Sequence, residues 1–176
     1  TPVTVTVVHL NDVYEILPVE GGKSVGLARV ATVIQQLKAT QSPLLTTVGG
    51  DYLSPSALGT AIVDGQPMAG RQMVDVLNAT GVDWATLGNH EFDVSEAAFR
   101  AHIAQAKFGI VSTNVTDARG LPFAGVPTSA IVPVTANGRT VRIGLIGVTI
   151  DRGGHGDALM HHANSVPMMM RSGARR

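Results

Sequence analysis

Cysteine is absent from this 176-residue chain, which excludes disulfides, thiolate zinc sites and a cysteine nucleophile. Any metal ion must therefore be bound through oxygen and nitrogen atoms. Long apolar runs are missing too, because none approaches the roughly 20 residues of a membrane span. The N-terminus lacks the basic-then-apolar pattern of a signal peptide. Since the first residue is Thr1 rather than Met, removal of a leader stays open, and the localisation is unknown.

The chain also lacks an excess of charge of either sign. Lys plus Arg (13) balances Asp plus Glu (13), so no overall field attracts the protein to nucleic acid or to an anionic membrane. Hydrophobic residues make up 44% of the sequence, which is enough to bury one sizeable core, and the length suggests one domain. The composition thus indicates a globular protein that does not bind nucleic acid.

Strand-like and helix-like patterns alternate along the chain, which predicts an α/β fold. The expected strands are 3–10, 44–48, 84–87 and 108–111, and the expected helices are 24–39, 69–79 and 95–107. Asn137-Gly138 is a strong hairpin signal between two further strands, 131–135 and 140–148. We therefore expect βαβ units followed by an added hairpin.

Polar clusters follow the predicted parallel strands. The first strand leads into His9-Leu10-Asn11-Asp12, the second into Gly49-Gly50-Asp51, and the third into Gly88-Asn89-His90-Glu91-Phe92-Asp93. Asn114 follows the fourth strand. A single Asp at such a position is more often a turn former, but the carboxyl ends of parallel strands meet at one sheet edge, where ligands gather. The sequence therefore predicts a functional site built from these clusters.

The motifs His9-x-Asn11-Asp12, Gly50-Asp51-x-x-x-x-Ser56 and the hexapeptide at 88–93 resemble those of the calcineurin-like metallophosphoesterases, most closely their 5'-nucleotidase branch. The resemblance covers residues 5 to about 150. It implies that residues 1–150 form the N-terminal part of a metallophosphoesterase domain, with the first sheet, its helices and a hairpin of the second sheet of an αββα sandwich. The implied activity is two-metal hydrolysis of nucleoside monophosphates or related phosphoesters, with Mn, Mg or Zn as candidate ions.

The resemblance also implies roles for five residues. Asp12 would bind one metal, Asp51 would bridge both, and Asn89 would bind the second. His90 would face the phosphate and donate a proton or hydrogen bond as the leaving oxygen develops charge, oriented by Asp93. A competing interpretation makes Asp93 a helix cap, because 93–96 has capping-box spacing.

Other polar residues of the motifs are expected to act without binding metal. His9, Tyr14 and Asn114 are candidates for supporting the ligands. Tyr14 stands where the family usually has His, and a neutral phenol is a poor ligand for a divalent ion. We interpret Tyr14 as the marker of a branch of the family, but it still leaves the first metal one ligand poorer. Glu91 is expected to be a solvated or structural turn residue, and His102 a surface or core residue.

The sequence after about residue 150 departs from the family pattern. The family completes its site with a His after a later strand and a Gly-His-x-His segment, and neither is found here. We expect 151–176 to be an irregular or disordered tail, in which the histidines are solvated rather than replacement ligands: His155, His161 and His162. The alternative hypothesis is therefore a truncated, catalytically incomplete chain that keeps the fold and weak metal binding. An exposed, incomplete second sheet would also favour self-association.

Overall fold

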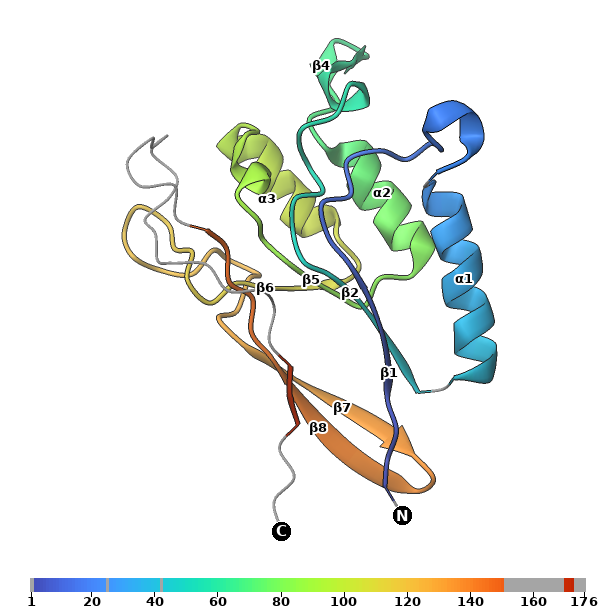
Figure 1. Cartoon of the computed structure of the whole chain (residues 1–176). Coiled ribbons are helices and arrows are strands. Elements are labelled where there is room, and N and C mark those ends of the chain that lie inside the picture. The colour runs from blue at the N-terminus through green and yellow to red at the C-terminus, as the bar shows by residue number, and fades with distance from the viewer. Residues whose placement is uncertain (1, 25, 42, 151–169, 173–176) are drawn as a thin grey trace.

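The computed structural model describes residues 2–24, 26–41, 43–150 and 170–172 (Figure 1). A four-stranded parallel sheet has the strand order β1-β2-β5-β6, and the three α-helices cover one of its faces (Figure 1). The strands are β1 (Thr6–Leu10), β2 (Leu44–Val48), β5 (Trp84–Thr86) and β6 (Gly109–Val111). The helices are α1 (Leu27–Thr40), α2 (Arg71–Thr80) and α3 (Glu96–Gln105). The α/β prediction is confirmed.

Local sequence explains where these elements begin and end. β1 starts at Thr6 rather than at residue 3. Thr6 pairs with Leu44, which is the first residue of β2 and follows Pro43, so the residues before Thr6 have no partner in β2. Gly81 ends α2 in the left-handed conformation (φ 80°) and donates its N–H to the carbonyl of Leu77, as expected for a helix C-terminus. The ends of these strands and helices are thus set by proline and glycine residues as much as by the spacing of hydrophobic residues.

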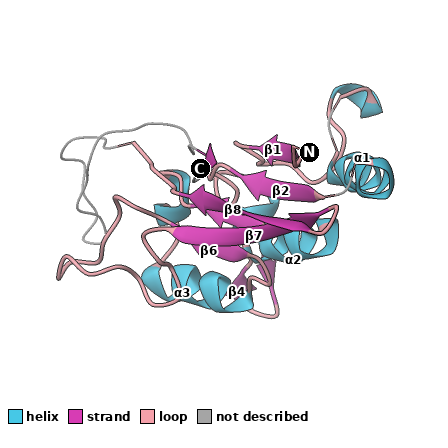
Figure 2. Ribbon diagram, turned by 90° about the horizontal axis from the view of Figure 1, so that it is seen from below, coloured by secondary structure: helices cyan, strands magenta, loops and turns pink. Residues whose placement is uncertain are grey.

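A second sheet packs on the other face of the first (Figure 2). Its hairpin consists of β7 (Ala130–Ala136) and β8 (Arg139–Leu145), joined at Asn137 and Gly138, both with positive φ. Buried side chains join the two layers: Leu45, Val111, Val134, Ile143 and Leu145. The predicted hairpin is confirmed. Ile131 is 54% exposed, and self-association through this sheet stays a prediction.

The structure adds elements that the sequence pattern did not indicate. β9 (Met170–Ser172) pairs antiparallel with β8, in a region without strand periodicity. The remainder of the predicted tail lies outside the described residues. A small hairpin, β3 (Ile62–Val63) and β4 (Gln66–Pro67), projects from the domain (Figure 1). Short 3-10 turns cover Glu20–Gly22 (η1), Leu58–Thr60 (η2) and His90–Phe92 (η3). No helix in the described ranges is long and apolar enough to cross a membrane.

His102 ties α3 to the segment that precedes α2. Its side chain is buried, at 7% exposure, and Nε2 lies 2.6 Å from the carbonyl oxygen of Ala69, to which it donates. Burial lowers the pKa of this imidazole below its usual 6.5. His102 is therefore a core residue, one of the two positions expected for it.

We predict that His102 makes the protein less stable in acid. The unfolded chain takes up a proton as the pH falls through about 6.5, whereas the folded imidazole resists it, so the free energy of unfolding decreases below that pH. Urea unfolding from about pH 8 to about pH 5 should show a smaller decrease for His102→Gln than for the wild type. Parallel pH profiles would contradict this origin of the acid sensitivity.

Candidate active site

The loops after β1, β2 and β5 meet at the carboxyl edge of the first sheet. The N–H of Asp12 donates to the carbonyl of Gly50 at 3.2 Å, and the N–H of Gly49 donates to Leu10 at 2.7 Å. The N–H of His90 donates to Oδ1 of Asp51 at 2.8 Å. The structure thus brings the three predicted motifs together by direct hydrogen bonds.

Two glycines allow this close approach. Gly50 has a φ of 99°, and a Cβ atom on it would overlap the backbone of Gly88. A Cβ atom on Gly88 would in turn overlap the Asp51 carboxylate. Only glycine therefore fits where the loops after β2 and β5 cross, so close packing explains why both of these motif positions are glycine.

Asp12 and Asp51 both have a left-handed backbone. Their φ angles are 53° and 57°, a conformation that Asp tolerates better than most residues but that still costs free energy. Such residues persist where the surrounding structure holds them, and they concentrate at functional sites. Both predicted carboxylate ligands are held in this way.

The two carboxylates influence each other. The side-chain hydrogen bond from Asn11, at 2.5 Å, is the main cause that lowers the pKa of Asp12. Burial is the main cause that raises the pKa of Asp51, and the negative charge of Asp12 raises it further. Two neighbouring acidic groups repel when both are ionised, and a cation between them relieves the repulsion. Binding of a cation beside this pair stays a prediction.

Glu91 is the most deeply buried acid of the site, with 0% exposure. One carboxylate oxygen accepts the N–H groups of Tyr52 and Leu53, at 2.7 and 3.1 Å. The other accepts those of Asp51 and Gly88, at 2.8 and 2.5 Å. Burial raises the pKa of Glu91 to about 7, and the backbone hydrogen bonds oppose this increase. Glu91 is thus structural, as one of the two expectations had it, but it is not solvated.

His90 and Asp93 form a hydrogen-bonded pair. Nδ1 of His90 lies 2.6 Å from Oδ2 of Asp93. The N-cap of α3 is Ser95, whose Oγ accepts the N–H of Ala98 at 3.3 Å. Of the two interpretations of Asp93, the structure therefore shows the contact with His90, while Ser95 caps the helix.

The three predicted supporting residues have different surroundings. The Tyr14 hydroxyl donates to Oδ1 of Asp12 at 3.0 Å, and its ring meets the His90 ring edge-on, with centroids 6.0 Å apart. Nδ1 of His9 lies 2.8 Å from Oγ1 of Thr47. The Asn114 side chain bonds both the N–H and the carbonyl of Thr149. Asn114 thus ties the segment after β6 to the one after β8, whereas Tyr14 contacts the site directly.

The side-chain oxygen atoms at the strand ends fit part of the coordination shell of a metal ion. Asp12, Asp51 and Asn89 offer oxygen atoms at three neighbouring strand ends, and oxygen is what hard divalent cations prefer. Within the described part of the chain, no group of three or more His, Cys, Asp or Glu side chains could hold a metal ion. His155, His161 and His162 lie outside the described residues.

The domain has helices on one face of its parallel sheet and a second sheet on the other, and it presents carboxylate and amide oxygens at the ends of the parallel strands. The chain belongs to the calcineurin-like phosphoesterase family, since the model of that family matches residues 5–165. Members of this family typically bind two metal ions.

Individual relatives are 5'-nucleotidases and related phosphoesterases. Snake venom 5'-nucleotidase of Gloydius brevicauda is 30% identical over 154 residues, covering 82% of this chain and 25% of that protein. The crystal structure of a 5'-nucleotidase precursor from Thermus thermophilus matches with a TM-score of 0.66 and 27% identity, over 83% of this chain and 28% of the other. YfkN from Bacillus subtilis, a calcineurin-like phosphoesterase, matches with a TM-score of 0.63 and 25% identity, over 83% and 48%. The chain thus spans about a quarter of the venom enzyme's length.

We predict that Glu91→Gln destabilises the protein far more than its small chemical change suggests. The amide nitrogen would face two backbone N–H groups that now share a carboxylate oxygen, and each buried N–H left unpaired costs about 1–3 kcal/mol. Chemical unfolding should show a loss of about 2–5 kcal/mol.

The matched control is Glu96→Gln, which removes an exposed ion pair with Arg100 and should change stability by less than about 0.5 kcal/mol. Similar small losses in both variants would show that the Glu91 carboxylate is not needed to join the loops.

Proposed function

We propose that this domain is a metal-dependent phosphoesterase of the 5'-nucleotidase type, which hydrolyses nucleoside monophosphates or related phosphoesters. The observation that carries the proposal is the direct bond from the His90 backbone to Asp51, while the His90 side chain is paired with Asp93. A proposed metal ligand and a proposed proton donor are thereby fixed in one unit.

Each residue of this unit has a distinct part in the proposal. Asp12, Asp51 and Asn89 would hold divalent ions, which supply an activated water and neutralise phosphoryl charge when bound. Nδ1 of His90 is engaged by Asp93, so Nε2 is the atom left to donate a proton to the leaving oxygen. The Asp93 carboxylate fixes the orientation of the imidazole ring through this hydrogen bond.

The alternative is a domain that binds metal weakly and does not hydrolyse phosphoesters. Tyr14 supports it, because its hydroxyl donates to Asp12 and its pKa is raised by burial and by that bond. A phenol that stays protonated adds no anionic ligand. The two hypotheses differ in whether the wild-type chain releases phosphate when Mn, Mg or Zn is added.

Substitution should separate proton donation from metal binding. His90→Asn should lower the rate of phosphate release from a nucleoside 5'-monophosphate by about 10²–10⁴-fold, as is typical for loss of a general acid, while calorimetry still detects Mn²⁺ binding. Asp51→Asn should lose most of the phosphate release and most of the Mn²⁺ binding, because it removes a negative charge from the proposed metal site.

Asp75→Asn is the matched control, since this exposed acid on α2 contacts Arg71 at 4.0 Å and Gln105 at 2.6 Å and is not one of the proposed site residues. Wild-type protein that releases no phosphate with any of the three ions would overturn the enzyme proposal. Loss of Mn²⁺ binding in His90→Asn would instead make His90 a ligand.

A further inference from the structure

Tyr14, in the segment after β1, reaches two parts of the proposed site at once. Its hydroxyl donates to Oδ1 of Asp12 at 3.0 Å. Its ring meets the His90 ring edge-on, with centroids 6.0 Å apart and an interplanar angle of 86°. One side chain therefore contacts a proposed metal ligand through its hydroxyl and the proposed proton donor through its ring.

We propose that Tyr14 is a positioning residue whose two parts act separately. The hydroxyl holds the Asp12 carboxylate in one orientation, and the ring fixes the plane of the His90 imidazole. This inference rests on the proposed function, because it takes the roles of Asp12 and His90 from there. Tyr14 adds no anionic ligand and transfers no proton. It restricts the motion of two groups that must be in place at the same time.

The Asp12 carboxylate needs such support because it is exposed and follows a left-handed backbone. Asn11 donates to its Oδ2 at 2.5 Å and Tyr14 donates to its Oδ1 at 3.0 Å, so each oxygen has a donor. A carboxylate oxygen has two lone pairs, and these bonds alone do not exclude a cation. Hydrogen-bond partners of this kind orient metal ligands, and their loss typically weakens metal binding about 10–100-fold.

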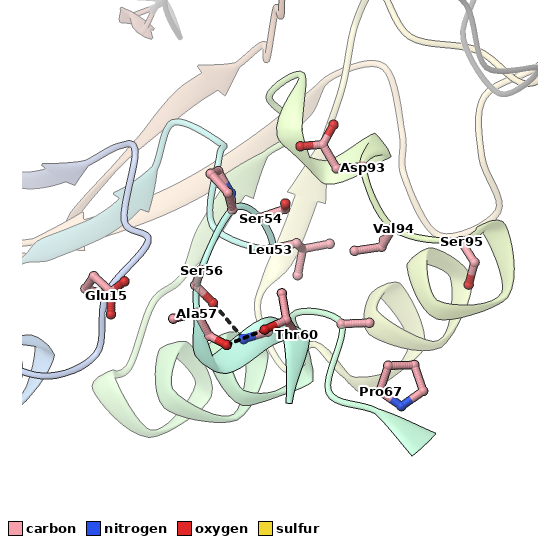
Figure 3. A pocket seen from close by; sticks show the side chains of 13 residues that line it. Glu15, Leu53, Ser54, Ser56, Ala57, Thr60, Pro67, Asp93, Val94 and Ser95 are labelled. Carbon is pink, nitrogen blue, oxygen red and sulfur yellow. Dashed lines mark hydrogen bonds between the residues drawn. The ribbon is translucent and has the colours of Figure 1, made fainter. Parts of the chain in front are cut away.

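The His90 ring needs a second contact because one hydrogen bond does not fix its plane. Nδ1 lies 2.6 Å from Oδ2 of Asp93, and the ring can still turn about the line through these atoms, since the last torsion of His is broad. The Asp93 side chain is 47% exposed and borders a pocket of about 710 Å³, which Glu15 lines from another side (Figure 3). This partner is itself only partly enclosed, so the edge-on contact with Tyr14 supplies the further restraint.

Removal of the hydroxyl and removal of the ring should have different effects. Tyr14→Phe keeps the ring and should weaken Mn²⁺ binding, measured by calorimetry, about tenfold. Tyr14→Leu removes both parts. It should weaken Mn²⁺ binding by a similar factor and, at saturating Mn²⁺, lower kcat for adenosine 5'-monophosphate about tenfold further than Tyr14→Phe does. Leu17→Ala, at a 72% exposed position of the same segment, is the control and should change either quantity by less than about twofold.

The ring can also be followed without hydrolysis. At one fixed pH, the nitrogen NMR signal of His90 Nδ1 should stay near its wild-type position in Tyr14→Phe. In Tyr14→Leu it should move toward that of free imidazole, because the bond to Asp93 is no longer held in place. This pattern, together with wild-type protein that releases no phosphate, would support the positioning role and reject the enzyme.

Two results would overturn the inference while the wild-type protein still releases phosphate. Unchanged Mn²⁺ binding in Tyr14→Phe would reject the role of the hydroxyl. Equal kcat values and equal Nδ1 signals in Tyr14→Phe and Tyr14→Leu would reject the role of the ring. Neither result would affect the proposed function.

Discussion

The buried carboxylate of Glu91 is the interaction on which the site depends. It accepts four backbone N–H groups, three from the loop after β2 and one from Gly88 after β5. When this acid is ionised, its hydrogen bonds are charge-assisted and stronger than neutral ones, and an unpaired N–H at this depth is costly. One side chain thus joins two loops whose residues lie up to 40 positions apart.

The strain of the site follows from that junction. Asp51 keeps a left-handed backbone while its own N–H is held by Glu91 and its side chain is held by the N–H of His90. Gly50 and Gly88 permit the loops to touch. The carboxylate of Asp51 is consequently presented next to the exposed Asp12, and its own burial beside that charge raises its pKa. A preorganised pair of this kind is what binding of a cation requires.

Much of this arrangement could be predicted from the sequence, because buried parallel strands have apolar runs that end in polar residues. The four strands, the three helices and the Asn137-Gly138 hairpin are local patterns, and Asp12, Asp51 and His90 stand at strand ends. Glu91 could not be assigned this way, since its four partners are defined only by how two loops pack. The β3–β4 hairpin was missed although its turn, Asp64-Gly65, has positive φ at both residues and is a hairpin signal.

Amide hydrogen exchange tests the role of Glu91 most directly. If its carboxylate joins the loops, the amides of Asp51, Tyr52, Leu53 and Gly88 should exchange as slowly as those in the middle of β2, although all four lie outside regular strands. Exchange at the rate of the exposed Asp64-Gly65 turn would contradict the account, because loops that open so easily could not hold Asp51 and His90 in place.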